Sequence, residues 1–255
     1  MHLIDTHTHI YLPEFDNDRD QVIARSLESG VEKLLMPNID QESFPRMMAA
    51  VNRYPGVCLP MNGLHPTSVK EDFQFQLEKI ECLAAEYTFC AIGEIGIDLY
   101  WDRTYLEEQI FVFKKQVELA LAKNMPVVIH SRESFAELLT ALEEFRGSGL
   151  KGVFHAFTGN REHAEKAVEL GFKLGIGGIV TFKNSGLDSV VKEVGIENIV
   201  LETDSPYLAP SPFRGKRNES SYLCIINKKV ADICEMNEED VASVTYSTSA
   251  ELFGL

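Results

Sequence analysis

The sequence predicts an α/β protein of the (β/α)8 TIM barrel class. Short apolar segments typical of strands alternate with longer amphipathic segments typical of helices along the whole chain. Eight such strands within 255 residues match the usual count and length of a barrel. Histidines and carboxylates follow several strands, at the end where barrel active sites lie. A doubly wound sheet shares this alternation, so the pattern alone leaves the closure of the sheet open.

The predicted strands are short apolar runs at residues 3–5, 32–37, 58–63, 89–95, 126–130, 152–155, 173–176 and 198–202. Helices are predicted at residues 16–29, 73–87, 105–123, 134–145 and 161–170, with two more at 222–235 and 238–252. Asn237 is the predicted N-cap of the last helix, because acidic residues follow it in the first turn. Residues 206–222 interrupt the alternation and are predicted to form a long loop.

The composition is ordinary for a globular protein with a sizeable core. Hydrophobic residues make up 45% and charged residues 25% of the chain. The five cysteines are scattered and contain no CxxC pair, which argues against a disulfide framework and fits a reducing compartment. The N-terminus lacks a basic segment followed by an apolar one. We therefore expect one cytoplasmic domain without membrane association and without an obligate protein partner.

The net charge of −15 at pH 7 bears on nucleic-acid functions. Phosphate backbones are bound by clustered cations, which argues against a general nucleic-acid coat protein. A nucleic-acid enzyme remains possible, because bound divalent metals add positive charge and a basic patch can be local. Arg214, Lys216 and Arg217 form one such cluster within the predicted long loop.

Ligand-type side chains collect where the predicted strands end. His7 and His9 follow the first strand, and their spacing puts both imidazoles on one side of an extended chain. Two such imidazoles suit an ion of intermediate softness, such as Zn²⁺ or Mn²⁺. The other side chains of this kind at strand ends are His65, Glu94, His130, His155 and Asp204.

Each of these residues also has a structural interpretation. A lone histidine after a strand is commonly a hydrogen-bonded structural residue, Glu94 can pair with a buried arginine, and Asp204 can cap a turn. Their number favours a metal centre, because burying so many ionisable groups together is costly without a cation. The candidate ligands are His7, His9, Glu94, His130, His155 and Asp204.

Six ligands exceed what one Zn²⁺ usually takes from protein and suit two divalent ions that share a carboxylate. Glu94 is the predicted bridge, because a carboxylate has two oxygens and Glu94 lies midway in the chain order of the ligands. Asp204 is predicted to bind one ion and to orient or deprotonate the attacking water. The donor set leaves the metal open between Zn²⁺, Mn²⁺ and similar ions.

The ordered motifs resemble those of the TatD family of metal-dependent hydrolases, a branch of the amidohydrolase-like barrels. The matching segments are DTHTH (5–9), GLHP (63–66), GEIGID (93–98), PVVIHSR (126–132), FHAFTG (154–159), LETDSPY (201–207) and RGKRN (214–218). They span nearly the whole chain, so the resemblance implies one metal-dependent hydrolase domain over residues 1–255. It also implies a (β/α)8 barrel with phosphodiesterase activity on DNA.

The resemblance further assigns roles to individual residues. It implies one ion held by His7, His9 and Asp204, a second held by His130 and His155, and Glu94 between them. The residues it places near the substrate are His65, Arg132, Arg214, Lys216 and Arg217. One departure is visible, because Ser220 stands where the family loop commonly has proline. Without proline, the backbone angle φ at this position is no longer fixed, which affects the loop conformation.

Three functions follow from these residues. The first is metal-assisted hydrolysis of phosphodiesters in DNA that is single-stranded or frayed, since Arg132 and the basic loop supply cations for phosphate. The second is hydrolysis of an ester or amide, including deacylation of mischarged tRNA, because activated water attacks carbonyl carbon and phosphorus alike. The third is a non-catalytic scaffold, which the presence of all six candidate ligands disfavours.

Overall fold

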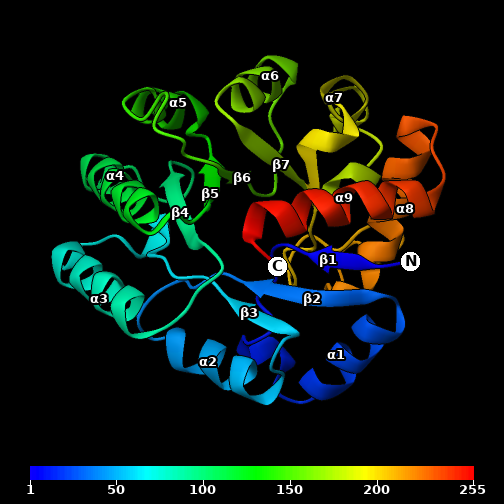
Figure 1. The fold of residues 1–255 in the computed structure, drawn as a ribbon, viewed down its shortest axis with the longest axis horizontal. Coiled ribbons are helices and arrows are strands. Elements are labelled where there is room, and N and C mark those ends of the chain that lie inside the picture. Colours follow the sequence, from blue (N-terminus) through cyan, green and yellow to red (C-terminus); the bar gives the residue numbers. More distant parts are fainter.

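A ring of parallel strands surrounded by helices runs through the computed structural model, which describes all 255 residues (Figure 1). The strands are β1 (Leu3–Asp5), β2 (Val31–Met36), β3 (Cys58–Pro60), β4 (Ile92–Asp98), β5 (Val127–Arg132), β6 (Gly152–Phe154), β7 (Phe172–Ile176) and β8 (Ile199–Leu201). The helices are α1 (Arg19–Glu28), α2 (Phe44–Arg53), α3 (Phe73–Glu86), α4 (Leu106–Lys123), α5 (Phe135–Glu143), α6 (Arg161–Glu169), α7 (Leu187–Val194), α8 (Leu223–Cys234) and α9 (Glu238–Phe253).

The strands pair in the order β1-β2-β3 and β4-β5-β6-β7-β8, and all pairs are parallel. Backbone hydrogen bonds bridge both gaps between these two sheets. The amide of Thr6 donates to the carbonyl of Leu201 (3.1 Å), and that of Gly93 donates to Asn62 (2.9 Å). The predicted (β/α)8 barrel is therefore confirmed, and the doubly wound alternative is excluded.

All eight predicted strands and all seven predicted helices are present, with boundaries that differ by a few residues. The sequence pattern did not single out α2 and α7, which are short, with 10 and 8 residues. Strand β4 is shifted from the predicted 89–95 to Ile92–Asp98, because its two glycines weaken a strand pattern. Asn237 is the N-cap of α9, and its side chain accepts a hydrogen bond from the amide of Asp240 (2.7 Å).

Side chains alternate between the inside of the barrel and its helical surroundings, as the two-residue period of strands requires. The interior cluster contains Ile4, Leu35, Met61, Ala91, Val128, Val153 and Val200, together with Leu252 and Phe253 of α9. The outward side chains pack against the helices in a larger core of 45 buried residues. Helix α9 thus closes one end of the barrel, beside β1 (Figure 1).

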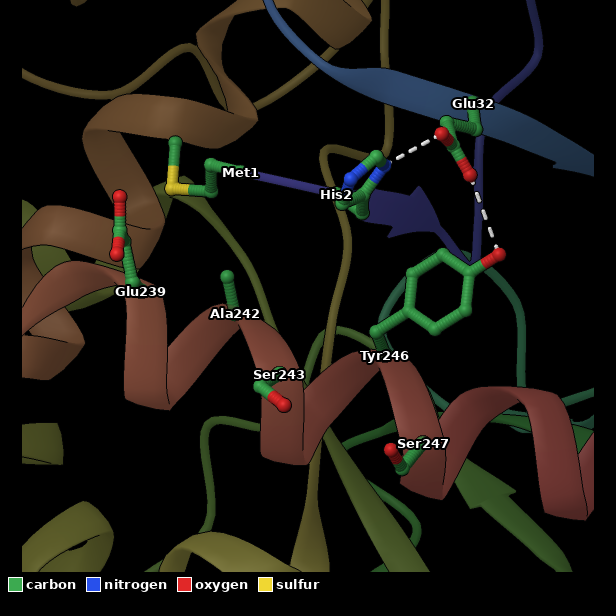
Figure 2. A pocket seen from close by; sticks show the side chains of 8 residues that line it. All are labelled: Met1, His2, Glu32, Glu239, Ala242, Ser243, Tyr246 and Ser247. Carbon is green, nitrogen blue, oxygen red and sulfur yellow. Dashed lines mark hydrogen bonds and ion pairs between the residues drawn. The ribbon is translucent and has the colours of Figure 1, made fainter.

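An open pocket of about 550 Å³ lies at this closed end, between α9 and the beginnings of β1 and β2. Its polar groups already bind one another: Tyr246 donates to Glu32 (3.2 Å), and Glu32 contacts His2 (2.6 Å) (Figure 2). The pocket is at the opposite end of the strands from the predicted ligands and takes no part in the site they form.

A buried carboxylate joins the first and last strands. Asp5 accepts hydrogen bonds from the amide (2.9 Å) and the hydroxyl (2.6 Å) of Thr203. Ser220, which stands where the related loops commonly have proline, is buried and lies 3.4 Å from the hydroxyl of Thr8. It is the first residue of a short 3-10 helix, a position where proline is favoured. The replacement therefore adds a buried polar contact at the barrel seam.

No helix of the structure is long and apolar enough to cross a lipid bilayer.

We predict that Thr203→Val lowers the free energy of unfolding by about 1–3 kcal/mol, because a buried carboxylate oxygen loses its hydroxyl donor. Urea denaturation followed by circular dichroism measures this loss. Thr140→Val on the exposed face of α5 is the matched control, since its hydroxyl bonds only a carbonyl of its own helix. Equal midpoints for the two variants would show that the Asp5–Thr203 contact does not stabilise the seam.

Candidate metal centre

All the predicted ligands meet at the carboxyl-terminal end of the barrel, opposite the end that α9 closes. Strand β1 ends at Asp5, so His7 lies in the bend that follows. His9 comes after Thr8, which forms an isolated parallel bridge with Ser205. The Nε2 atoms of His7 and His9 lie 3.3 Å apart. The remaining side chains come from β4 and β5 and from the segments after β3, β6 and β8: Glu94, His130, His65, His155 and Asp204.

One face of the Glu94 carboxylate meets the histidines that follow β1. Its Oε2 atom lies 3.2 Å from Nε2 of His7 and 3.7 Å from Nε2 of His9. Oδ1 of Asp204 faces the same two nitrogens, at 3.7 and 3.5 Å. His7, His9 and Glu94 thus form one group whose ligand atoms lie close enough for a divalent ion, and Asp204 forms another with His7 and His155.

The other carboxylate oxygen of Glu94 meets a second group of histidines. Oε1 lies 2.9 Å from Nδ1 of His130 and 2.8 Å from Nε2 of His155. It also lies 3.2 Å from Nε2 of His65, which the sequence predicted as a substrate contact. Each oxygen of Glu94 therefore faces a different set of nitrogens, which is the arrangement expected of a carboxylate between two ions.

Glycines on β4 let Glu94 reach this position. A Cβ at Gly93 would lie 2.7 Å from the Cβ of Val128, and one at Gly96 would lie 2.0 Å from the carbonyl oxygen of His130. Gly96 also has a φ of 151°, which L-residues rarely adopt. Only glycine at these positions allows β4 and β5 to approach so closely beside the Glu94 side chain.

Asp204 also depends on its backbone conformation. Its φ is 55°, in the left-handed region that aspartate tolerates better than most residues. Its amide donates to the carbonyl of His7 (2.9 Å), which locks the end of β8 to the segment after β1. Such conformations cluster at functional sites, where the surrounding contacts hold them.

Three further residues, which were not predicted from the sequence, lie beside the imidazoles. The hydroxyl of Tyr11 donates to the carbonyl of Pro37 (2.6 Å), so it accepts from Nδ1 of His9 (3.1 Å) and leaves the His9 Nε2 lone pair free. Nε2 of His130 contacts Oδ2 of Asp98 (2.8 Å). Residues that hold metal-binding histidines in this way set their orientation and basicity.

The third residue is Glu202, whose Oε1 accepts a hydrogen bond from the amide of Ala156. The same oxygen lies 3.6 Å from Nδ1 of His155, beyond hydrogen-bond distance. Both Asp98 and Glu202 are carboxylates at the end of an apolar strand and fall within the GEIGID and LETDSPY motifs. That is the same local signal that singled out Glu94. What the sequence cannot show is which carboxylate faces the cluster and which supports a histidine from behind.

The electrostatics show a cluster held together by shared protons. Burial opposes ionisation of Glu94, but the imidazoles of His155, His65 and His7 hold its pKa well below the usual range. Burial also disfavours protonated His155, yet Glu94 and Glu202 raise its pKa well above that of a free histidine. Burial and the charge of His155 lower the pKa of His7. Glu94 therefore stays ionised, and the protonated form is favoured for His155 but not for His7.

The residues fit a divalent metal. Nδ1 of His7 and Nδ1 of His155 are buried without a hydrogen-bond partner, and their two rings stack with centroids 3.8 Å apart. Both rings turn Nε2 toward the Glu94 carboxylate, at 3.2 and 2.8 Å. A cation held there would compensate the buried charge of Glu94. The donor set of imidazole nitrogens and carboxylate oxygens suits Zn²⁺, Mn²⁺ and similar ions.

The predicted substrate residues of the loop have different partners in the structure. The guanidinium of Arg217 makes two bonds to Asp18, at 2.7 and 2.6 Å. Arg217 therefore binds within the protein, because both arms of its guanidinium contact Asp18, the N-cap residue of α1. Arg214 is exposed and lies 4.6 Å from the ring of Phe182, and Lys216 is also exposed.

Residues 4–254 match the family model described as TatD related DNase. The chain belongs to the TatD family. The protein is thus a metal-dependent hydrolase, and its dependence on a metal agrees with the cluster of histidines and carboxylates.

Relatives of the TatD family match this chain over nearly their full length. The uncharacterized metal-dependent hydrolase YabD of Bacillus subtilis is 36% identical, with 98% of both chains covered. The 3'-5' ssDNA/RNA exonuclease TatD of Cronobacter turicensis is 31% identical, covering 98% of this chain and 97% of that protein. The crystal structure of the TatD homolog YjjV from Escherichia coli has a TM-score of 0.89 at 28% identity, covering 99% and 98% of the two chains.

We predict that Asp98→Asn lowers the affinity for a divalent metal by about 10- to 100-fold. An amide has one acceptor oxygen, so it cannot serve both His130 and the backbone amides that Asp98 also binds. Titration of the metal-free protein with Zn²⁺ in competition with a chelator measures the change. Asp102→Asn in the same loop is the control, because Asp102 contacts no histidine. Unchanged metal affinity in both variants would show that Asp98 does not support metal binding through His130.

Proposed function

We propose that the protein hydrolyses phosphodiester bonds in DNA, with single-stranded or frayed ends as its substrate and two divalent ions as its cofactors. The observation that carries this proposal is Glu94, whose two oxygens face two separate groups of imidazoles. We assign His7, His9 and Asp204 to one ion. His130 and His155 are assigned to the other, with Glu94 shared between them.

Bound divalent ions supply Lewis acidity and lower the pKa of water enough for attack at neutral pH. The side chains of this protein orient the water and take up its proton. Burial raises the pKa of the Asp204 carboxyl, but His9 and His7 lower it more, so the group is ionised at neutral pH. Its side chain is 13% exposed, against 3% for Glu94. Asp204 is therefore placed to orient and deprotonate an incoming water, while Glu94 stays in the interior.

The substrate side of the site is cationic although the whole chain is acidic. His65 and Arg132 follow β3 and end β5, next to Glu94 and His130 respectively. Arg214 and Lys216 have no carboxylate at the distance of an ion pair, so we assign the contact with backbone phosphates to them. The role first expected of Arg217 passes to these two, because Asp18 holds its guanidinium.

Two observations support DNA over an ester or amide substrate. Exposed cations suit a phosphate backbone better than a neutral carbonyl compound. A relative of similar length carries the name 3'-5' ssDNA/RNA exonuclease. Amidohydrolase-like chemistry, including deacylation of mischarged tRNA, is the alternative, since the same cluster can activate water for either bond. We also propose that the chain forms one catalytic domain and retain its cytoplasmic location as a prediction.

We predict that chelation and His7→Ala each abolish cleavage of a 5'-labelled single-stranded oligonucleotide. Chelated wild-type protein should recover with added Mn²⁺ or Zn²⁺, whereas the variant should not, because its ligand set is incomplete. His163→Ala on the outer helix α6 is the matched control. The same proteins are also assayed for hydrolysis of a model ester and of an aminoacyl-tRNA. Cleavage of these compounds with no action on DNA would establish the alternative, and DNA cleavage that survives both treatments would refute the metal mechanism.

We predict that Arg214→Ala combined with Lys216→Ala raises KM for DNA several-fold, leaves kcat nearly unchanged and lowers the salt dependence of kcat/KM. Each lost phosphate contact removes roughly 0.7 from the slope of log K against log salt for a single strand. The control is Arg161→Ala with Lys166→Ala, two exposed cations on α6 that pair with acidic residues. An unchanged KM and slope would show that the loop does not contact the substrate.

A further inference from the structure

Two neighbouring aromatic side chains stand exposed directly after β4. Tyr100 and Trp101 are 50% and 68% exposed, and their rings meet edge to face with centroids 4.9 Å apart. The guanidinium carbon of Arg132 lies 3.8 Å from the centre of the Tyr100 ring and 5.2 Å from that of Trp101. Arg132 is itself exposed, and the adjacent Glu133 pairs with Arg103 instead (3.1 Å). We call Tyr100, Trp101 and Arg132 the aromatic platform.

The platform is rigidly connected to the metal centre through Asp98. One oxygen of this buried carboxylate accepts the backbone amides of Tyr100 (3.0 Å) and Trp101 (3.2 Å). The other contacts Nε2 of His130 (2.8 Å). The amide of Leu99 also donates to the carbonyl of Arg132 (2.9 Å), so the two sides of the platform are tied by the backbone. A group bound there lies next to the reacting end of the site.

The chemistry of the platform suits an unpaired nucleobase. Exposed aromatic rings and a guanidinium plane offer flat π surfaces on which any base stacks, with little dependence on sequence. A base within a duplex has both faces covered by its neighbours and cannot use such a surface. Because the protein carries a net charge of −15, attraction of the phosphate backbone is weak outside the local cations, and stacking has to supply much of the affinity.

We propose that the platform of Tyr100, Trp101 and Arg132 stacks an unpaired nucleobase next to the phosphodiester that is cleaved, and so selects single-stranded ends. This inference rests on the proposed nuclease function and names the group that the site recognises. It makes Tyr100 and Trp101 substrate-binding residues, with Arg132 in contact with both the base and its phosphate.

Trp101 is the only tryptophan in the chain, so tryptophan fluorescence, excited selectively over the eight tyrosines, reports on the platform alone. The metal-loaded protein is titrated with a nuclease-resistant phosphorothioate oligothymidylate. Quenching or a spectral shift that saturates with the oligomer is expected, and an abasic oligomer of the same length and charge should produce far less. Equal responses to both would overturn the proposal, because they would show that charge rather than the base is recognised.

Variants test the same point through kinetics. Trp101→Leu keeps an apolar side chain without an aromatic face and should raise KM for single-stranded DNA about tenfold, with little change in kcat. Trp101→Phe should retain most of the wild-type KM, since it keeps the aromatic face. Phe75→Ala is the control, because Phe75 is 54% exposed on α3 and also has a cation, Lys79, 5.0 Å from its ring centre.

The outcomes separate this inference from the nuclease proposal. The platform would be refuted, and the nuclease left intact, if the wild-type protein cleaves DNA, its Trp101 fluorescence does not respond to the oligomer, and Trp101→Leu has the same KM as the wild type. Wild-type protein that cleaves no nucleic acid would refute both. A fluorescence response to an oligosaccharide or to an aromatic peptide, with none to oligothymidylate, would assign the platform to a different partner and overturn the proposal.

Discussion

The charge of one buried carboxylate organises the functional end of this barrel. Glu94 is 2% exposed and lies within 3.7 Å of nitrogens from five histidines. A lone carboxylate in such a place would cost several kcal/mol of unfavourable desolvation. The imidazoles compensate it with shared protons, and divalent ions do so more fully. The buried charge of Glu94 is therefore stable only beside the histidines, and protonated histidines in the same place are stable only beside Glu94.

The barrel makes this concentration of charge possible by separating it from the core. Apolar side chains of the interior cluster fill the barrel toward α9, and the polar side chains occupy the opposite end. Hydrogen bonds between β1 and the segment after β8 then join the first and last ligands in the sequence, His7 and Asp204. Stability and chemistry are thus assigned to different ends of the same strands, as barrel enzymes generally arrange them.

Asp98 shows how the centre and its surroundings depend on each other. One oxygen orients His130, and the other fixes the turn that presents Tyr100 and Trp101. A single carboxylate therefore sets both a ligand and the neighbouring surface. The three cations of the basic loop differ in their surroundings. Arg217 binds Asp18 and so anchors the loop, whereas Arg214 and Lys216 are exposed.

The sequence by itself determined the eight strands and the class of fold, and its motifs predicted the histidines and carboxylates that gather around Glu94. Apolar periodicity is a local property, and the motifs place ligands such as His130 and Asp204 at strand ends, which a parallel barrel brings to one side. Which residue each of these side chains contacts was decided by the tertiary structure alone. Whether a carboxylate faces the cluster, like Glu94, or supports a histidine, like Asp98, depends on the bulge and close glycine contacts of β4. Likewise, Asp18 is about 200 positions away from Arg217 in sequence, and no local pattern encodes a contact between residues so far apart.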